Sequence, residues 1–444
     1  MNMMCWTRAA VVLSCGLLAA PAYAITVQQV HSPGGLDAYL VEDHTTPVVA
    51  ISFGFAGGSA LDPVDQLGLS DLVASLLDEG AGDLDSFTFQ SELEDLAISI
   101  RYNVDPDMTR GRLTTTSANI ARGIELTRLT LTAPRFDEEP VERIRRQILV
   151  SLANRMEQPG YIASRALFES LYGDHPYGRS SDGTPESIAS IDREDMLNWV
   201  KSRFGRDRLI IGAAGDITPE ALGRAVDQIF GELPETTGLN PQLPEANIPT
   251  EGRTVHVEKN LPQTVIYMGQ KGIKREDPDW YTATVVDYVL GGGSFASRLM
   301  DEVREKRGLA YSVSTGLAPY DAGAIITAAV GTRAEQAGES LKIIRDEWKK
   351  MADSGPTAEE VADAKQYLTG AWPLRFTSTG SIADILLAVQ RDKLGLDYLD
   401  KRNSLVEAVT VQDTRRVAHE LYDPEALTVV IVGPENVDAA PVKP

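Results

Sequence analysis

The same pattern of hydrophobic and polar positions occurs twice along the chain, and the two copies lie 218 residues apart. Each copy begins with apolar residues that recur every three or four positions, which is the period of an amphipathic helix. A short turn follows, and then a nearly continuous apolar run that ends in glycine, as expected of a buried strand. The equivalent pairs are Asp195 and Asp413, Phe204 and Tyr422, Leu209 and Leu427, and Gly215 and Gly433. The chain is therefore predicted to be an internal duplication.

Weaker matches extend the duplication through both halves. The strand-like segments 48–54 and 264–269 correspond to each other. Each half also contains long amphipathic helical patterns, such as those over 139–156 and 334–353. Because strands and long helices are mixed in both copies, we predict an α+β fold, a tandem pair of domains that are each a mixed sheet backed by helices.

A segment rich in proline and glycine, 236–253, separates the two copies and predicts an extended surface linker. The N-terminal domain is then expected to span 25–235 and the C-terminal domain 254–444. Residues 1–24 combine an arginine, an apolar run and a final Ala-Tyr-Ala, which is typical of a cleaved signal peptide. The apolar run is too short to cross a bilayer. A membrane anchor and a lipid-modified Cys15 are the alternatives.

Both cysteines, Cys5 and Cys15, lie inside this predicted signal peptide. The mature chain is therefore expected to contain no disulfide and no cysteine nucleophile. Export without disulfides favours a periplasmic location. The formal net charge of −22 argues against nucleic acid or anionic membranes as partners.

An apolar helical stripe within 68–79 resembles the first active-site helix of the pitrilysin family of zinc peptidases. That family, which includes insulin-degrading enzyme and the mitochondrial processing peptidase, carries His-x-x-Glu-His in this helix. Two imidazoles there hold zinc, and the glutamate activates a water molecule. Here the three positions are occupied by Asp71, Ala74 and Ser75. The resemblance thus implies a zinc site whose first ligands are lost.

The third zinc-ligand position is also lost, and the sequence shows neither another metal site nor a serine hydrolase motif. The family's third zinc ligand is a glutamate in a later helix, and Ser151 or Val150 lies where it should be. None of the five histidines is spaced to share a metal with another, and no Gly-x-Ser-x-Gly motif indicates a serine hydrolase. We expect no metal or other cofactor in this chain.

The second half carries the most specific match to the family. Gly291, Gly292 and Gly293 precede a predicted helix that is acidic at its start and basic at its end, and a strand follows. In the family, an arginine and a tyrosine seven residues later contact substrate at the catalytic zinc, and Arg304 and Tyr311 match them. Such donors can bind a peptide carbonyl and stabilise the oxyanion that forms during hydrolysis.

Each of these features also has a simpler interpretation. Arg304 could be a solvated charge at a helix end, and Tyr311 a half-buried strand residue. The three glycines could form an ordinary tight turn before a helix that is capped by Ser294 or Ser297.

The resemblance implies a clam-shell of two domains and a function shared between two chains. We expect the non-catalytic subunit of a periplasmic heterodimeric zinc peptidase, whose related partner carries His-x-x-Glu-His and the zinc. This chain would be inactive alone and would supply the arginine–tyrosine pair and the glycine-rich loop for peptide hydrolysis. The alternatives are a catalytically inactive binding or scaffold protein of the same fold and an active enzyme that uses other residues.

Overall fold

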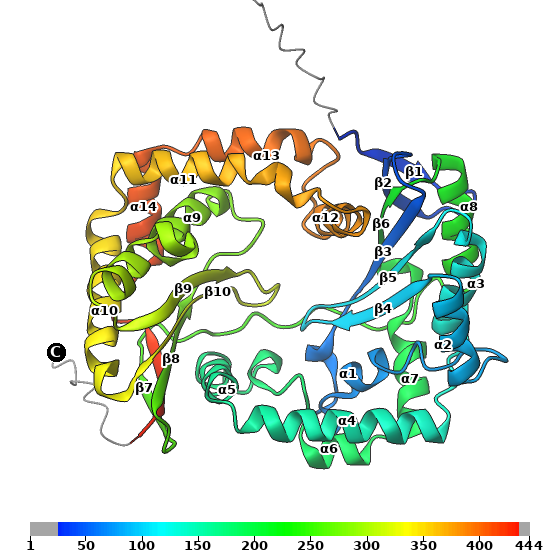
Figure 1. Ribbon diagram of the computed structural model, residues 1–444, viewed down its shortest axis with the longest axis horizontal. Coiled ribbons are helices and arrows are strands. Elements are labelled where there is room, and N and C mark those ends of the chain that lie inside the picture. Colours follow the sequence, from blue (N-terminus) through cyan, green and yellow to red (C-terminus); the bar gives the residue numbers. More distant parts are fainter. Residues whose placement is uncertain (1–24, 435–444) are drawn as a thin grey trace, which may run out of the picture.

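The computed structural model describes residues 25–434, which form two α+β halves that lie side by side (Figure 1). The predicted signal peptide, with Cys5 and Cys15, and residues 435–444 lie outside the described residues. Within 25–434, no helix has both the length and the apolar character needed to cross a membrane.

The N-terminal half is built on a six-stranded sheet with the order β1-β2-β6-β3-β5-β4. Strand β3 is antiparallel to β5 and β6, whereas β2 and β6 are parallel. The strands are β1 (Gln28–His31), β2 (Asp37–Glu42), β3 (Val48–Ala56), β4 (Ser99–Val104), β5 (Met108–Thr116) and β6 (Leu209–Gly215). The helices are α1 (Leu69–Ala74), α2 (Ser86–Asp95), α3 (Ile120–Thr132), α4 (Glu138–Met156), α5 (Pro159–Tyr172), α6 (Pro185–Ser190), α7 (Arg193–Arg203) and α8 (Pro219–Phe230). Phe53, Phe55 and Phe230 pack edge to face in the core of this half.

The C-terminal half is built on a five-stranded sheet with the order β7-β11-β8-β10-β9. Its strands are β7 (Thr254–Glu258), β8 (Gln263–Lys271), β9 (Ala310–Ala318), β10 (Ile325–Arg333) and β11 (Thr428–Gly433). Its helices are α9 (Trp280–Asp287), α10 (Ala337–Ser354), α11 (Ala358–Gly370), α12 (Thr379–Arg391), α13 (Tyr398–Glu407) and α14 (Val411–Leu421). Two π-helices, η5 (Tyr288–Gly292) and η7 (Met300–Glu305), and the short 3-10 helix η6 (Ser294–Ala296) connect α9 to β9.

The connections of the strands confirm the α+β fold and the tandem duplication. Strand β6 lies between a parallel neighbour, β2, and an antiparallel neighbour, β3, and β11 has the same arrangement between β7 and β8. The helices before these strands also start alike, because α7 and α14 each begin with a capping box. The boxes are formed by Asp192 with Asp195 and by Thr410 with Asp413, again 218 residues apart.

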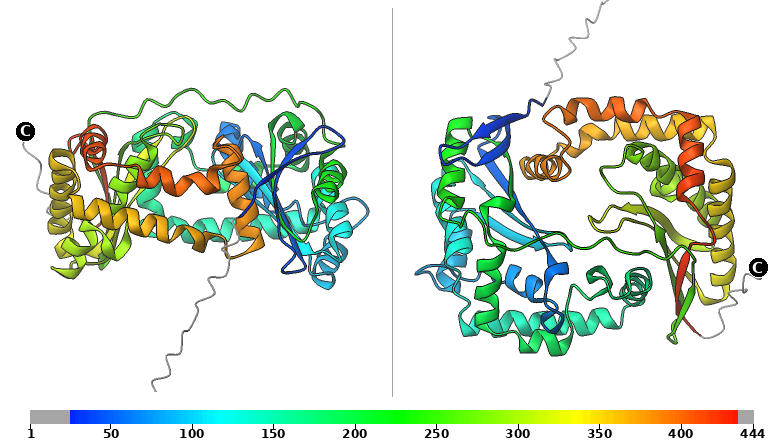
Figure 2. Two further views of the ribbon diagram at one scale, coloured as in Figure 1. Left: turned by 90° about the horizontal axis from the view of Figure 1, so that it is seen from above. Right: turned by 180° about the vertical axis from the view of Figure 1, so that it is seen from behind.

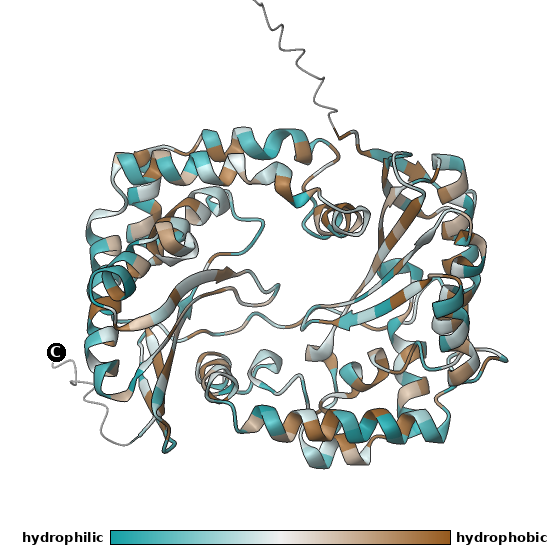
Figure 3. Ribbon diagram, in the orientation of Figure 1, coloured by the Kyte–Doolittle hydropathy of each residue, from teal (hydrophilic) through white to brown (hydrophobic). Residues whose placement is uncertain are grey.

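Each half lends one helix to the sheet of the other half. Helix α5 packs on β8 and β11, where Leu167 and Leu171 share an apolar cluster with Val430. Helix α12 packs on β3 and β6, where Leu386 shares a cluster with Ala214. These sheet strands are largely apolar, whereas the outer helices alternate between apolar and polar residues (Figure 3). Because α5 and α12 cross over, the halves are joined by a buried interface as well as by the chain.

The connection between the halves contains no regular structure. Helix α8 ends at Phe230 and β7 begins at Thr254, and the chain between them runs across from one half to the other (Figure 2).

The helix that resembles the family's zinc helix is shorter than its apolar stripe predicts. Helix α1 ends at Ala74, and the chain continues in turns in which the Leu76 amide bonds the Val73 carbonyl at 2.9 Å. Leu76 and Leu77 are nevertheless buried, so the stripe marks the core-facing side of the segment correctly but not its helical length. A stripe of this kind reports burial, and a tight turn can bury the same side chains.

Candidate functional site

The positions that match the family's zinc ligands and its water-activating glutamate lie on α1, directly after it and on α4, and within residues 25–434 they do not form a metal site. Ala74 is buried and has no donor atom, while Ser75 and Ser151 are exposed hydroxyls. Zinc in proteins is bound by thiolate, imidazole and carboxylate groups, and only Asp71 offers one of these. Within residues 25–434, no group of three or more His, Cys, Asp or Glu side chains is placed to hold a metal ion. The residues present therefore do not fit zinc.

A fixed positive charge lies near Asp71. Burial raises the pKa of the Asp71 carboxyl, the nearby Asp182 raises it further, and Arg155 opposes both effects. Arg155 itself donates to Asp182 at 2.8 Å, in a contact between α4 and the loop before α6. The surroundings of Asp71 are thus held by side-chain packing and by the Arg155 guanidinium rather than by a metal ion.

The structure brings Arg304 and Tyr311 together and adds a third residue, Phe295. The Arg304 guanidinium carbon lies 4.8 Å from the centre of the Tyr311 ring and 4.6 Å from that of Phe295. Both rings are open to solvent, with exposed fractions of 82% for Tyr311 and 64% for Phe295. We call this group the Arg304 stack. Two exposed aromatic rings around one arginine differ from an isolated helix-end charge, because each ring attracts the cation.

Sequence reasoning did not single out Phe295. It lies in η6, directly after the three glycines, so the glycine-rich segment leads to the Arg304 stack. An exposed phenylalanine between Gly293 and a helix that starts near Ser297 was the available signal. Ser297 caps that helix, since its Oγ accepts a hydrogen bond from the Met300 amide at 3.4 Å.

The glycine-rich segment approaches its own chain closely. A Cβ added at Gly291 would lie 2.7 Å from the Thr315 nitrogen on β9, and one at Gly292 would lie 2.5 Å from Oδ2 of Asp287. The Thr315 hydroxyl donates to Oδ1 of Asp287 at 2.7 Å. Burial raises the pKa of the Asp287 carboxyl to about 6. Gly291 is thus required by its packing against β9, and Gly292 by its approach to Asp287 at the end of α9.

The Arg304 stack lies at the end of β9 that is distant from the N-terminal half. Tyr311 is near the start of β9, and the other end of the strand leads to Tyr320 and Ala322, which contact Tyr177 of the N-terminal half. Tyr311 and Ala318 are seven steps apart on the strand, which is roughly 23 Å at about 3.3 Å per residue. Within residues 25–434, no hydrogen bond or ion pair joins Arg304 to the α1 positions Asp71 and Ser75. Figure 1 likewise shows α1 and β9 in opposite halves.

Two family models match successive parts of the chain. Residues 38–184 match the family model described as "Insulinase (Peptidase family M16)". Residues 190–368 match the model described as "Peptidase M16 inactive domain".

Two curated relatives cover most of the chain. The protein named "Non-peptidase homolog YmxG" of Helicobacter pylori is 28% identical over 357 residues, which is 80% of this chain and 81% of that protein. A Streptomyces coelicolor protein named as an uncharacterized zinc protease is 25% identical over 92% of this chain and 90% of its own length.

Two solved structures share the arrangement of both halves. The crystal structure of a peptidase M16 inactive domain from Pseudomonas fluorescens is 28% identical, with a TM-score of 0.86, and the match covers 92% of this chain and 98% of that one. The crystal structure of a protease from Helicobacter pylori has a TM-score of 0.84 over 93% of this chain and 100% of that one. At 19% identity, it supports the fold alone.

Proposed function

This chain belongs to the insulinase family of peptidases, family M16, and from that membership we propose that it is the non-catalytic subunit of a periplasmic heterodimeric zinc peptidase. The partner would be a related chain that carries His-x-x-Glu-His and the zinc. The signal-peptide pattern of residues 1–24 supports the periplasmic location.

The observation that carries this proposal is the exposed Arg304 stack, together with the absence of a metal-binding group within residues 25–434. Arg304 and Tyr311 present their donors at a solvent-facing corner between η7 and β9, distant from the chain's own α1. A group in this position can contact a substrate held by another chain. A substrate-binding pair without a catalytic centre is what a non-catalytic subunit needs.

The chemistry assigned to this chain is positioning and charge stabilisation. Zinc bound by the partner would supply the activated water that attacks the peptide. The Tyr311 hydroxyl would then donate a hydrogen bond to the carbonyl oxygen of the scissile bond. The Arg304 guanidinium would stabilise the negative charge that develops on that oxygen, because the two flanking rings hold it in place.

The test is reconstitution with a His-x-x-Glu-His chain of the same family, followed by peptide hydrolysis assays. We expect activity only in the mixture, no zinc in this chain alone, and a loss of about 100-fold in kcat for Arg304→Ala, the size expected for an oxyanion donor. Tyr311→Phe should lower kcat without separating the subunits. Arg224→Ala, an exposed arginine on α8 in the other half, is the matched control and should leave turnover unchanged.

Two outcomes would contradict the proposal. Zinc-dependent activity of this chain alone would show that it has its own catalytic centre. Unchanged turnover in both Arg304→Ala and Tyr311→Phe would remove the substrate-contacting role of the Arg304 stack.

One comparison favours a second candidate, a catalytically inactive binding or scaffold protein. The Helicobacter pylori relative bears the name "Non-peptidase homolog". In that case the chain would bind a partner of the same family, and the complex would hydrolyse no peptide.

A further inference from the structure

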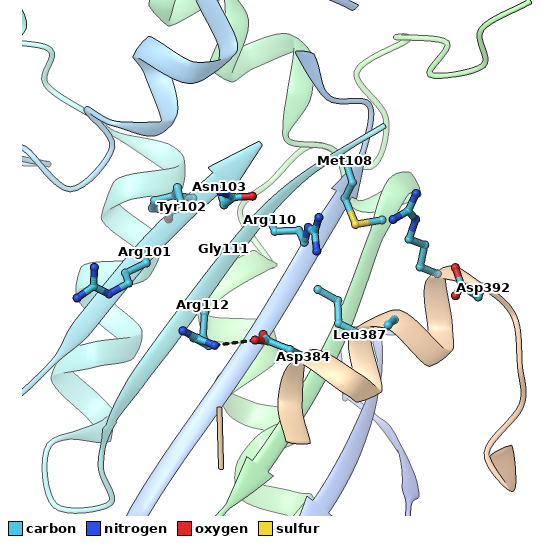
Figure 4. Close-up of a pocket in the computed structure, with 12 residues that line it drawn as sticks. Arg101, Tyr102, Asn103, Met108, Arg110, Gly111, Arg112, Asp384, Leu387 and Asp392 are labelled. Carbon is cyan, nitrogen blue, oxygen red and sulfur yellow. Dashed lines mark hydrogen bonds and ion pairs between the residues drawn. The ribbon is translucent and has the colours of Figure 1, made fainter. Parts of the chain in front are cut away.

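A pocket lined by arginines lies between the edge of the N-terminal sheet and helix α12 of the other half (Figure 4). Its volume is about 440 Å³, and strands β4 and β5 form one wall. Its charged lining consists of four arginines against two aspartates, Arg101, Arg110, Arg112, Arg391, Asp384 and Asp392. A local excess of positive charge in a chain of net charge −22 indicates a site that could bind an anionic group.

The strand register brings three of these arginines onto one face of the sheet. Arg110 and Arg112 are two residues apart on β5 and project toward α12 (Figure 4). Arg101 on β4 is the direct cross-strand neighbour of Arg112. Like charges that face each other across two strands repel, so an anion that bound between them would lower the energy of this arrangement.

Other carboxylates hold the arginines from outside the pocket wall. Arg110 pairs with Asp105, and Arg391 pairs with Asp321 at 3.2 Å, and neither aspartate lines the pocket. These pairs fix the guanidinium groups, and an arginine keeps further N–H donors free after one such contact.

Donor capacity remains inside the pocket. Nε of Arg110 is buried and has no acceptor among the described residues. Arg101 is exposed and forms no ion pair with any side chain within 25–434, whereas Arg112 donates to Asp384 at 2.6 Å. Because Nε of Arg110 is buried, the donors that a ligand can reach are those of Arg101, which lies at the open edge of the pocket and extends away from Asp384 (Figure 4).

We propose that this pocket binds a carboxylate of a peptide, carried either by an acidic side chain or by the peptide's C-terminus. The inference rests on the proposed function in that the ligand is a peptide. Strand β4 is the edge of its sheet, so its free backbone groups can pair with an extended peptide beside the pocket. Met108 and Leu387 give the same pocket an apolar floor for the carbon atoms of the acidic side chain. In the first case the site would select acidic segments, and in the second it would select peptides with a free C-terminus.

The experiment measures binding to the purified full chain by titration calorimetry at low salt, without partner or zinc. Three peptides of one sequence are compared: one with two aspartates, one with asparagines in their place, and the asparagine peptide with an amidated C-terminus. We expect the aspartate peptide, or the free C-terminus, to bind at least about tenfold more tightly than its neutral counterpart, as charge-assisted hydrogen bonds provide. The pair that shows the difference identifies the source of the carboxylate.

Arg101 is the residue to change, because it is exposed and holds no other element in place. Arg101→Gln should remove most of the preference for the carboxylate, and Arg101→Glu should reverse it. Arg224→Gln, an exposed arginine on α8 far from the pocket lining, should keep the wild-type preference.

Equal affinity for all three peptides, no binding of any peptide, or an unchanged preference in Arg101→Gln would overturn this inference. None of these results depends on hydrolysis. A loss of turnover in Arg304→Ala together with equal peptide affinities would therefore reject the pocket assignment and keep the proposed function. Unchanged turnover in Arg304→Ala together with a preference for the carboxylate would reject the proposed function and keep the pocket assignment.

Discussion

Arg304 gains its orientation from Phe295 as well as from Tyr311, and this makes Phe295 a positioning residue. Its ring lies against the guanidinium and is otherwise largely exposed, so it contributes little to the core. A cation and an aromatic ring at an exposed site attract each other by about 0.5–1 kcal/mol. The consequence should appear in turnover far more than in stability.

We predict that Phe295→Ala lowers kcat of the reconstituted complex about tenfold, because a shift of the guanidinium weakens the charge contact that Arg304 makes with the reacting carbonyl. KM should change less than kcat, and the melting temperature should stay within a few degrees of the wild type. Phe295→Tyr keeps the ring and should restore most of the activity. A large loss of stability without a kinetic effect would assign Phe295 to packing instead.

Asp287 predicts a pH dependence of stability. Burial raises its pKa to about 6 from the ordinary 3.8, so the folded chain holds this proton to a higher pH than the unfolded chain does. The stability associated with the protonated group is fully present below pH 3.8 and is lost as the pH rises through 6. Asp287→Asn removes this loss, while its side-chain oxygen can still accept from Thr315.

The free energy of unfolding of Asp287→Asn should therefore exceed that of the wild type by up to about 3 kcal/mol at pH 8, and by about half as much at pH 5. Urea unfolding at both pH values measures the difference between the two proteins. A difference that does not change with pH would show that Asp287 is ionised, or neutral, in both states throughout this range.

At the scale of elements, the contact of η5 with β9 depends on a missing side chain. Gly291→Ala would place a Cβ 2.7 Å from the Thr315 backbone nitrogen, so η5 or β9 must shift. We predict a loss of about 1–3 kcal/mol in the free energy of unfolding. Gly331→Ala on β10 is the matched control, since its Cβ would have no atom within 4 Å and should change stability little. Equal effects of both changes would mean that η5 adjusts freely.

The sequence predicted elements well where periodicity and a repeat supported each other. The 218-residue repeat predicted α7 with β6 and α14 with β11, because each copy contains an amphipathic helix followed by a buried strand. It overestimated α1, because Leu76 and Leu77 are buried in a turn rather than in a helix. Apolar periodicity shows which side chains are buried. It does not show whether the backbone that carries them forms a helix or a series of turns.

The sequence predicted one part of the candidate functional residues and missed another. Arg304 and Tyr311 could be predicted from the sequence because the resemblance to the family marks both residues within one short segment. The arginine pocket was not, because Arg101 and Arg391 are far apart in the chain and come from different halves. Their proximity depends on how α12 packs on the N-terminal sheet, and an amphipathic pattern does not reveal which partner covers it.

At the scale of the whole molecule, the exchange of α5 and α12 fixes how the two sheets face each other. Gly212 on β6 shows how closely α12 approaches, since a Cβ there would lie 2.5 Å from the Ala383 carbonyl oxygen. Each exchanged helix covers apolar residues of the opposite sheet, such as Val432 under α5 and Ala50 under α12. The orientation of the halves is thus a property of the folded core.

The exchange also means that the covalent connection through 236–253 is not what keeps the molecule whole. A protease that nicks this segment should leave both fragments associated, so the nicked protein should elute from a sizing column at the intact position and separate only in denaturant. Either fragment produced by itself would leave a sheet face bare and should aggregate, and co-expression of the two should rescue both. Elution of two separate soluble fragments after nicking would contradict this expectation. A split protein, produced as two chains that end and begin within 236–253, is accordingly a variant that this architecture should tolerate.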